Sequence, residues 1–265
     1  MQRRTSMPLR LVLSAAIAAV IGAGAAQAET IKIGVTPGPH AQVLEVVKPI
    51  AAKKGLDIQI IEFSDYVIPN TALDAGEIQA NSFQHQPYLD NQKKDRGFKI
   101  ESVGATLNFP LGIYSKKHKS FADVPAGGTV AIQNDPTNGG RSLLLLQANG
   151  IIKVKPEAGL KPSVADIIDN PKKLKIIEVE AAQAPRSLDD VDAASINTNY
   201  ATQAGLTLND AILKEDAKGP YVNVIAVRSV DKDKPWVKTL LASYHTPEVK
   251  AFVQEKFKGA VLPSW

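Results

Sequence analysis

The stretch TVAIQNDPTNGGRSLLLLQAN at residues 129–149 holds the pattern that decides the fold. TVAIQ at 129–133 predicts a short strand, and GRSLLLLQAN at 140–149 predicts a helix. The polar residues between them, 134–139, form the link. A strand that leads directly into a helix is the repeating unit of a parallel sheet covered by helices, so this stretch predicts the α/β class.

The same alternation extends in both directions along the chain. Strands are expected at 30–36, 57–63, 78–83, 99–107, 129–133, 174–180, 192–197 and 221–228. Helices are expected after Pro39, where apolar side chains recur on one face, and at 140–149, 234–245 and 246–257, with Thr246 as the N-cap of the last. Two such sets of strands and helices on one chain predict a two-lobed architecture.

The first 28 residues match the three-part pattern of a secretory signal peptide. Basic residues precede an apolar run that ends in Ala-Gln-Ala, so cleavage is expected after Ala28. A membrane-spanning helix is the alternative, but Gly22 and Gly24 interrupt the apolar run and a polar segment follows at once. We therefore expect an exported protein.

Removal of this segment leaves a chain with almost no net charge. The segment contains three of the 31 basic residues and none of the 27 acidic ones, so the mature chain has a net charge of +1. This balance argues against a nucleic-acid partner. The sequence has no cysteine, so it offers no disulfide and no thiol for a lipid anchor, and we expect a soluble periplasmic protein held by its core.

Two polar stretches follow predicted strands, where open α/β sheets bind their ligands. NSFQHQPYLD at 81–90 follows the strand at 78–83 and brings Phe83, His85 and Tyr88 close together. Such a group can be ordinary core, a metal site or the wall of a ligand pocket, and its residue types alone favour the core. NDPTNGGRS at 134–142 is the second stretch.

Arg141 lies in the first turn of the helix predicted at 140–149. The free N–H groups of a helix start favour an anion, and a guanidinium adds a bidentate fork suited to a carboxylate. The alternative is a structural ion pair with a nearby acid such as Asp135. Gly139 and Gly140 do not have the spacing of a phosphate-binding loop.

Motifs for catalysis and for metal binding are missing from the sequence. There is no GxSxG elbow, no HExxH and no cysteine nucleophile, so we expect no enzyme, no catalytic residue and no cofactor. His40, His85, His118 and His245 are scattered, and only His85 falls in an expected cleft. A metal-binding import protein is therefore the weaker alternative.

Four stretches of the sequence carry a family resemblance. They are FSDYVIPNTALDAGEIQANSFQHQPYLD (63–90), NDPTNGGRSLLLLQANGIIK (134–153), LKIIEVEAAQAPRSLDDVDAASINTNYA (174–201) and PYVNVIAVR (220–228). They resemble the substrate-binding proteins of bacterial methionine ABC importers, the NlpA-type lipoprotein family, over nearly the whole mature chain. The resemblance implies a type II periplasmic-binding-protein fold with methionine in the cleft between two lobes. A methionyl dipeptide or another hydrophobic amino acid remains an alternative cargo.

The resemblance also implies a set of ligand-binding residues. Those around the ligand side chain would be Tyr66, Phe83, His85 and Tyr88; Arg141 would bind the carboxylate, and Asn197 and Asn223 the amino-acid backbone. The bottom-up chemistry agrees, because a zwitterion needs an anion fork, neutral amides and a shaped pocket. A neutral His85 would add a weak hydrogen bond to the ligand sulfur. The chain departs from the family at the signal cleavage site, where Glu29 stands instead of a lipidated cysteine.

The lobes follow from the same resemblance. The signal peptide would be 1–28, lobe one 29–110 together with 223–265, and lobe two 111–222. The chain would cross between lobes near 108–113 and 219–224, and the lobes would close over the ligand. The implied partners are the permease and ATPase of an ABC importer, and the binding protein is expected to act as a monomer.

Overall fold

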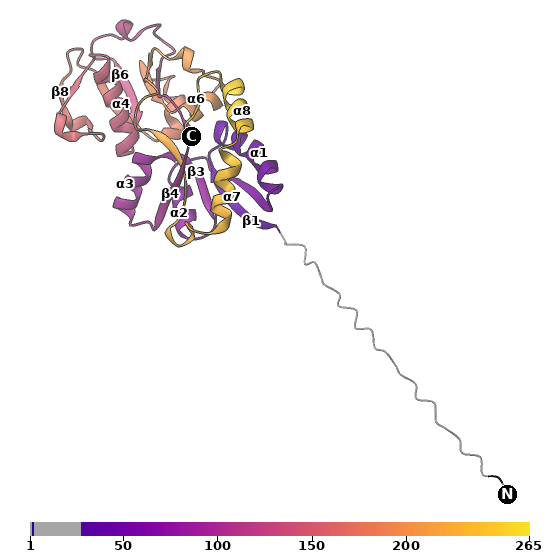
Figure 1. The fold of residues 1–265 in the computed structure, drawn as a ribbon. Helices are drawn as coiled ribbons and strands as arrows, with labels where there is room; N and C mark the ends of the chain where they lie inside the picture. The colour runs from indigo at the N-terminus through magenta and orange to yellow at the C-terminus, as the bar shows by residue number, and fades with distance from the viewer. Residues whose placement is uncertain (1, 3–27) are drawn as a thin grey trace.

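A computed structural model describes residues 2 and 28–265 (Figure 1). Almost all of the predicted signal peptide therefore lies outside the described residues. Figure 1 shows two groups of strands and helices side by side. The α/β class predicted from the sequence is confirmed.

The first sheet has six strands in the order β13-β4-β12-β3-β1-β2. Its strands are β1 (Glu29–Val35), β2 (Leu56–Glu62), β3 (Ala80–His85), β4 (Ile100–Asn108), β12 (Val222–Arg228) and β13 (Leu262–Pro263). β1 runs parallel to β2 and β3, but β12 is antiparallel to both β3 and β4. The sequence predicted no direction for β12, which runs antiparallel because the chain returns from the second sheet and enters the first from the opposite end.

Helices cover the first sheet on both faces. They are α1 (Pro39–Ala52), α2 (Ile68–Asp74), α3 (Gln86–Arg96), α7 (Pro235–Tyr244) and α8 (Pro247–Phe257). The predicted apolar face of α1 is buried at Val43, Val47 and Ala51, and it packs against α7 and α8 in the largest core cluster. Thr246 caps α8 as predicted, because its hydroxyl accepts the N–H of Val249 at 3.3 Å.

The second sheet has five strands in the order β11-β5-β10-β6-β9. They are β5 (Gly112–Tyr114), β6 (Thr129–Gln133), β9 (Lys175–Val179), β10 (Ala193–Ile196) and β11 (Leu213–Lys214). Its helices are α4 (Pro136–Ala148), α5 (Ala184–Ser187) and α6 (Thr198–Gln203), and a separate hairpin joins β7 (Lys153–Val154) to β8 (Ile167–Asp169). β6 lies parallel to β9 and β10, so its carboxyl end delivers the chain into α4.

Helix α4 begins four residues earlier than predicted, at Pro136. Asp135 is its N-cap and accepts the N–H groups of Thr137 and Asn138 at 3.1 and 2.9 Å. The carboxylate of Asp135 thus takes the place that an anionic ligand was expected to occupy at this helix start. Arg141 consequently lies in the second turn, away from the free N–H groups of the helix start. Any anion that it binds must therefore be held by its guanidinium.

Two glycines explain why the sequence misled about the start of α4. They suggest a turn, but both lie inside the helix and permit close packing. A Cβ on Gly139 would stand 2.5 Å from the carbonyl oxygen of Gln133, and one on Gly140 would stand 2.8 Å from Cα of Lys161. Gly139 and Gly140 are therefore needed because they have no side chain, and not because their backbone is flexible.

The segments between the two sheets lie against each other. The chain leaves the first sheet after Asn108 and returns to it at Val222, and the Asn108 amide donates to the carbonyl of Ala217. The predicted crossings and the limits of the lobes stay predictions.

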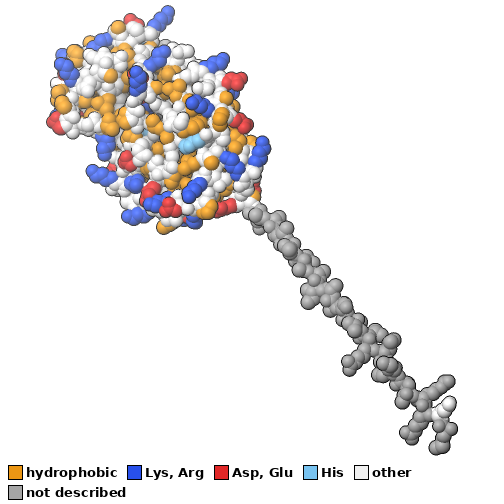
Figure 2. Space-filling model, in the orientation of Figure 1, with side chains coloured by type: hydrophobic (Ala, Val, Ile, Leu, Met, Phe, Trp, Pro, Cys, Tyr) orange, Lys and Arg blue, Asp and Glu red, His pale blue; other side chains and the backbone are white. Residues whose placement is uncertain are grey.

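On the face that Figure 2 shows, acidic and basic side chains are interspersed, without a large patch of one sign. Within residues 28–265, every helix is too short or too polar to cross a membrane.

Candidate functional site

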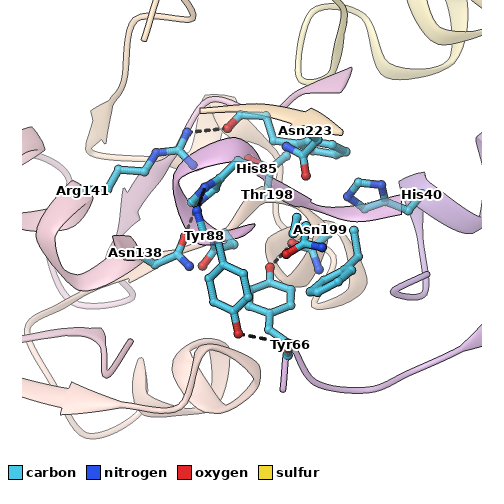
Figure 3. A pocket seen from close by; sticks show the side chains of 13 residues that line it. His40, Tyr66, His85, Tyr88, Asn138, Arg141, Thr198, Asn199 and Asn223 are labelled. Atoms are coloured by element: carbon cyan, nitrogen blue, oxygen red, sulfur yellow. Dashed lines mark hydrogen bonds between the residues drawn. The ribbon is translucent and has the colours of Figure 1, made fainter. Parts of the chain in front are cut away.

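A cavity lies between the two sheets and draws its lining from both (Figure 3). The space free of atoms within it is about 380 Å³, part of which is open to solvent. All seven residues predicted from the sequence line it: Tyr66, Phe83, His85, Tyr88, Arg141, Asn197 and Asn223. Six further residues complete the lining: His40, Gln84, Phe109, Asn138, Thr198 and Asn199.

Tyr66, Phe83 and Tyr88 form one side of the cavity, the aromatic wall. Their ring centroids are 5.9 to 6.1 Å apart, and the tilted and edge-to-face arrangements are those that aromatic rings prefer. Phe83 projects from β3, and Pro87 in the first turn of α3 brings Tyr88 beside it. Burial raises the pKa of Tyr66 and of Tyr88, so both phenols stay protonated and act as donors.

His85 joins the end of β3 to the start of α3. Its Nδ1 accepts the N–H of Tyr88 at 3.1 Å as the helix N-cap, which leaves the proton on Nε2 to be donated to Oδ1 of Asn138 at 3.2 Å. Burial, and then the positive charge of Arg141, lower the pKa of His85 to about 3. The ring is therefore neutral, and its Nε2 proton is directed to Asn138.

Three amide side chains opposite the aromatic wall form a hydrogen-bonded group, the amide cluster of Gln133, Asn138 and Asn197. Gln133 donates to Oδ1 of Asn197, and Asn197 donates to Oδ1 of Asn138, each at 2.8 Å. Asn138 donates in turn to the N-cap carboxylate of Asp135 at 2.8 Å. Asn197, predicted to bind a ligand, is thus already bonded at both ends of its amide, with one donor and one acceptor position to spare.

Asn223 differs from the amide cluster in having no such bonds. It lies on β12 directly opposite His85 of β3, so both side chains point to the same face of the sheet. It is buried, and its amide has no hydrogen-bond partner among residues 28–265. Both its carbonyl oxygen and its NH₂ group are therefore available to a ligand (Figure 3).

Arg141 is the charged residue in the cavity lining. Its Nε donates to Oε1 of Glu215 at 2.9 Å, and its Nη2 donates to Oε2 of Glu215 and, at 2.8 Å, to the carbonyl oxygen of Phe109. The guanidinium also lies over the ring of Tyr221, 4.1 Å from its centroid. The structural ion pair considered for Arg141 thus forms with Glu215 instead of Asp135, and Nη1 remains for the cavity.

Hydrogen bonds cross between the two predicted lobes around the cavity. The Tyr66 hydroxyl donates to Oδ1 of Asn199 at 2.6 Å, and the Tyr200 hydroxyl donates to the carbonyl oxygen of Ser64 at 3.1 Å. Farther out, Lys161 donates to Oδ1 of Asn91 at 2.8 Å. These bonds hold the two sides together, so the structure is that of a closed cleft.

His40 is the most informative residue that the sequence reasoning missed. Its ring lies against Phe109 with centroids 4.6 Å apart, and burial lowers its pKa to about 3. Its Nδ1 is buried without a partner among the described residues. A signal was available, since His40 follows the carboxyl end of β1 just as His85 ends β3, and ligands of α/β sheets bind at such positions.

The side chains in residues 28–265 do not form a group of three histidines or acids placed to hold a metal ion. The cavity lining combines one cation, several amides and aromatic rings. Such a set can bind a carboxylate, a polar neutral group and an apolar chain at once.

Comparison with known proteins gives consistent matches over the mature chain. A sequence model of the family described as NlpA lipoprotein matches residues 31–265. The D-methionine-binding lipoprotein MetQ of Salmonella typhimurium is 48% identical over 271 residues, covering 98% of this chain and all of that protein. A nutrient binding protein from Burkholderia cenocepacia, solved bound to methionine, is 55% identical with a TM-score of 0.87, covering 89% of this chain and all of that one. Outer membrane lipoprotein 3 of Mannheimia haemolytica is 47% identical, covering 90% of this chain and 92% of that protein.

These matches correct the predicted localisation. The family description and the names of both sequence relatives identify lipoproteins, and this finding contradicts the prediction of a soluble, unanchored protein. That prediction rested on the absence of cysteine. A missing thiol removes one chemistry of lipid attachment, and it does not establish that a protein is free of the membrane.

Proposed function

Because this chain belongs to the NlpA lipoprotein family, we propose that it is an extracytoplasmic solute-binding protein that captures methionine in its cleft and delivers it to an ABC importer. The observation that carries the proposal is the composition of the cavity. Nη1 of Arg141 and the unpaired amide of Asn223 lie in one cavity with the aromatic wall. An amino acid with an apolar side chain is the small molecule that needs all three.

A bound methionine would be oriented by its charged end. Its carboxylate would accept from Nη1 of Arg141, a charge-assisted hydrogen bond. The ammonium would donate to Oδ1 of Asn223, and the spare acceptor position of Asn197 is a further candidate. The thioether chain would lie along the aromatic wall, where sulfur gains about 0.3–1.5 kcal/mol for each ring it contacts. His85 would support this pose by holding Tyr88 and Asn138 in place.

Binding in this pose ties the two lobes together. We propose lobe limits of 29–110 with 223–265 and of 111–222, because the strands of each sheet fall within these ranges apart from Val222, the first residue of β12. The aromatic wall and Asn223 then belong to one lobe, and Arg141 and Asn197 to the other. A ligand that bridges them favours the closed state, since it gains its contacts only there. The permease and ATPase of the importer would recognise the closed monomer.

The proposal is tested by unfolding the purified protein and identifying any released small molecule by mass spectrometry. Methionine in the eluate is the expected result. Protein refolded without ligand is then titrated calorimetrically with L-methionine, D-methionine, a methionyl dipeptide and leucine. Binding of the dipeptide or of leucine in preference to both methionines would keep the solute-binding role and replace the cargo. Failure of all four to bind would overturn the proposal.

A further inference from the structure

Glu215 lies behind Arg141 as seen from the cavity. Its carboxylate receives both Nε and Nη2 of Arg141, yet Glu215 is not part of the cavity lining. It follows β11, close to the point where the chain leaves the second sheet. Its side chain is mostly buried, with 15% of its surface exposed, so solvent screens the pair only in part.

The position of Glu215 is fixed from two sides. Its backbone N–H donates to the carbonyl oxygen of Leu111 at 2.9 Å, and Oε2 accepts the N–H of Leu111 at 3.1 Å. Leu111 lies in the other segment that connects the two sheets. Glu215 is therefore held against Arg141 by the backbone as well as by the ion pair, and it cannot turn away when a ligand enters.

This arrangement limits what Arg141 can offer. A guanidinium has five N–H groups, one on Nε and two on each Nη. Glu215 and the Phe109 carbonyl take the one on Nε and both on Nη2. The two on Nη1 are left, and Figure 3 shows the end of the Arg141 side chain directed toward the ring of labelled residues around the cavity. Arg141 thus presents a directed pair of donors whose positive charge is already balanced.

No other full charge in the described lining changes this balance. His40 and His85 are neutral, and the remaining lining side chains are aromatic, amide or hydroxyl groups. Asp135 is a further carboxylate beside the lining, and it is bonded to the first N–H groups of α4 and to Asn138. The positive end of the helix dipole offsets its charge.

We infer that Glu215 is a positioning residue that makes the cavity selective for a zwitterion over a simple carboxylate. With Arg141 and Glu215 paired, a ligand of zero net charge leaves the buried site neutral. An anion without an ammonium group would leave one uncompensated negative charge there, which is costly in a buried site. The inference rests on the proposed function and adds the reason why the site would admit amino acids and exclude the corresponding acids.

The test compares methionine with γ-methylthiobutyrate, which is methionine without its amino group. Affinities of both are measured by calorimetry for the wild type and for Glu215→Gln, which keeps the shape and removes the charge. We expect the preference for methionine over the acid to fall by about tenfold or more in the variant. Methioninol has the ammonium but no carboxylate. In Glu215→Gln, the preference for methionine over methioninol should therefore rise.

Two further variants separate charge from structure. Glu215→Asp retains the charge and should restore the preference even if all affinities fall. Asp216→Asn removes the same charge from the neighbouring residue, which bonds to Lys218 and not to Arg141, and should leave the preference unchanged. An equal loss of all three ligands in Glu215→Gln, with methionine still bound by the wild type, would overturn this inference alone. Absence of methionine binding by the wild type would overturn the proposed function and the inference with it.

Discussion

The aromatic wall and two members of the amide cluster, Asn138 and Asn197, line the same cavity, but different forces hold the wall and the cluster. The wall is three rings packed at centroid distances near 6 Å, and few of its atoms are fixed by hydrogen bonds. The cluster is a chain of hydrogen bonds of 2.8 Å that runs from Gln133 to Asp135. Packed rings define a shape, whereas a hydrogen-bonded chain of amides fixes the positions of its side chains.

The difference shows that lining a cavity is not the same as being available to a ligand. Asn197 and Asn138 line it, yet most of their polar atoms are engaged with neighbours. Asn223 and Nη1 of Arg141 have no such engagement among the described residues. Polar recognition should therefore depend on a few atoms, and the amide cluster should act mainly by keeping them in place.

Arg141→Ala is the substitution with the largest expected effect on methionine affinity and on stability. It removes the charged donor and should weaken methionine binding by about 1.5–3 kcal/mol. It also leaves Glu215 buried without its partner, so the free energy of unfolding should fall by about 3 kcal/mol. Calorimetry with methionine and urea unfolding measure the two effects separately.

Arg228→Ala is the matched control for Arg141→Ala. Arg228 pairs with the buried carboxylate of Asp231 at 2.7 Å, but it does not line the cavity. Its loss should lower stability and leave methionine affinity unchanged. Unchanged affinity in Arg141→Ala itself would show that the guanidinium has no role in holding the carboxylate.

Local sequence signals predicted the elements that flank the cavity. Prolines at the starts of α1 and α3 mark where strands give way to helices, and these local signals do not depend on distant residues. The predicted start of α4 was wrong because Gly139 and Gly140 were interpreted as a turn. These glycines instead allow close packing against Gln133 and Lys161, and local sequence does not show that packing. The antiparallel direction of β12 likewise depends on where the chain re-enters the first sheet.

Pairings between distant residues account for what sequence reasoning missed at the site. Local spacing suggested Asp135 as the partner of Arg141, whereas the partner is 74 positions away at Glu215. The use of both ring nitrogens of His85 by Tyr88 and Asn138 is also a result of the fold. The family resemblance therefore predicted which side chains line the cavity, and only the fold determines which of their atoms remain free.

Acid should weaken the region where the aromatic wall meets the amide cluster. Burial lowers the pKa of His85 and of His40 from 6.5 to about 3, so both are neutral when folded and take up a proton when unfolded below pH 6.5. Stability is thus full above pH 6.5 and is lost as the pH falls toward 3. At pH 5 the expected loss is about 2 kcal/mol for each histidine.

Urea unfolding at pH 7 and pH 5 measures this loss. His85→Gln and His40→Gln should each reduce the difference between the two pH values by about half, whatever their effect at pH 7. Equal unfolding free energies of the wild type at both pH values would contradict the burial of neutral histidines beside the cavity.

Tyr66→Phe should have the smallest effect, and it separates the shape of the aromatic wall from its hydrogen bonds. The variant keeps the ring and removes the donor to Asn199, a bond between the two proposed lobes. Closure should become less favourable, and methionine affinity should fall by about 0.5–1.5 kcal/mol. Calorimetry measures the change.

Tyr200→Phe shows whether the loss in Tyr66→Phe comes from closure. Its hydroxyl also crosses between the proposed lobes, to the carbonyl of Ser64, but Tyr200 does not line the inner cavity. If the wall contributes only shape, the two variants should lose similar affinity, because each removes one bond of the closed state. A clearly larger loss in Tyr66→Phe would mean that its hydroxyl reaches the ligand, and the aromatic wall would then share in the polar recognition assigned to Arg141 and Asn223.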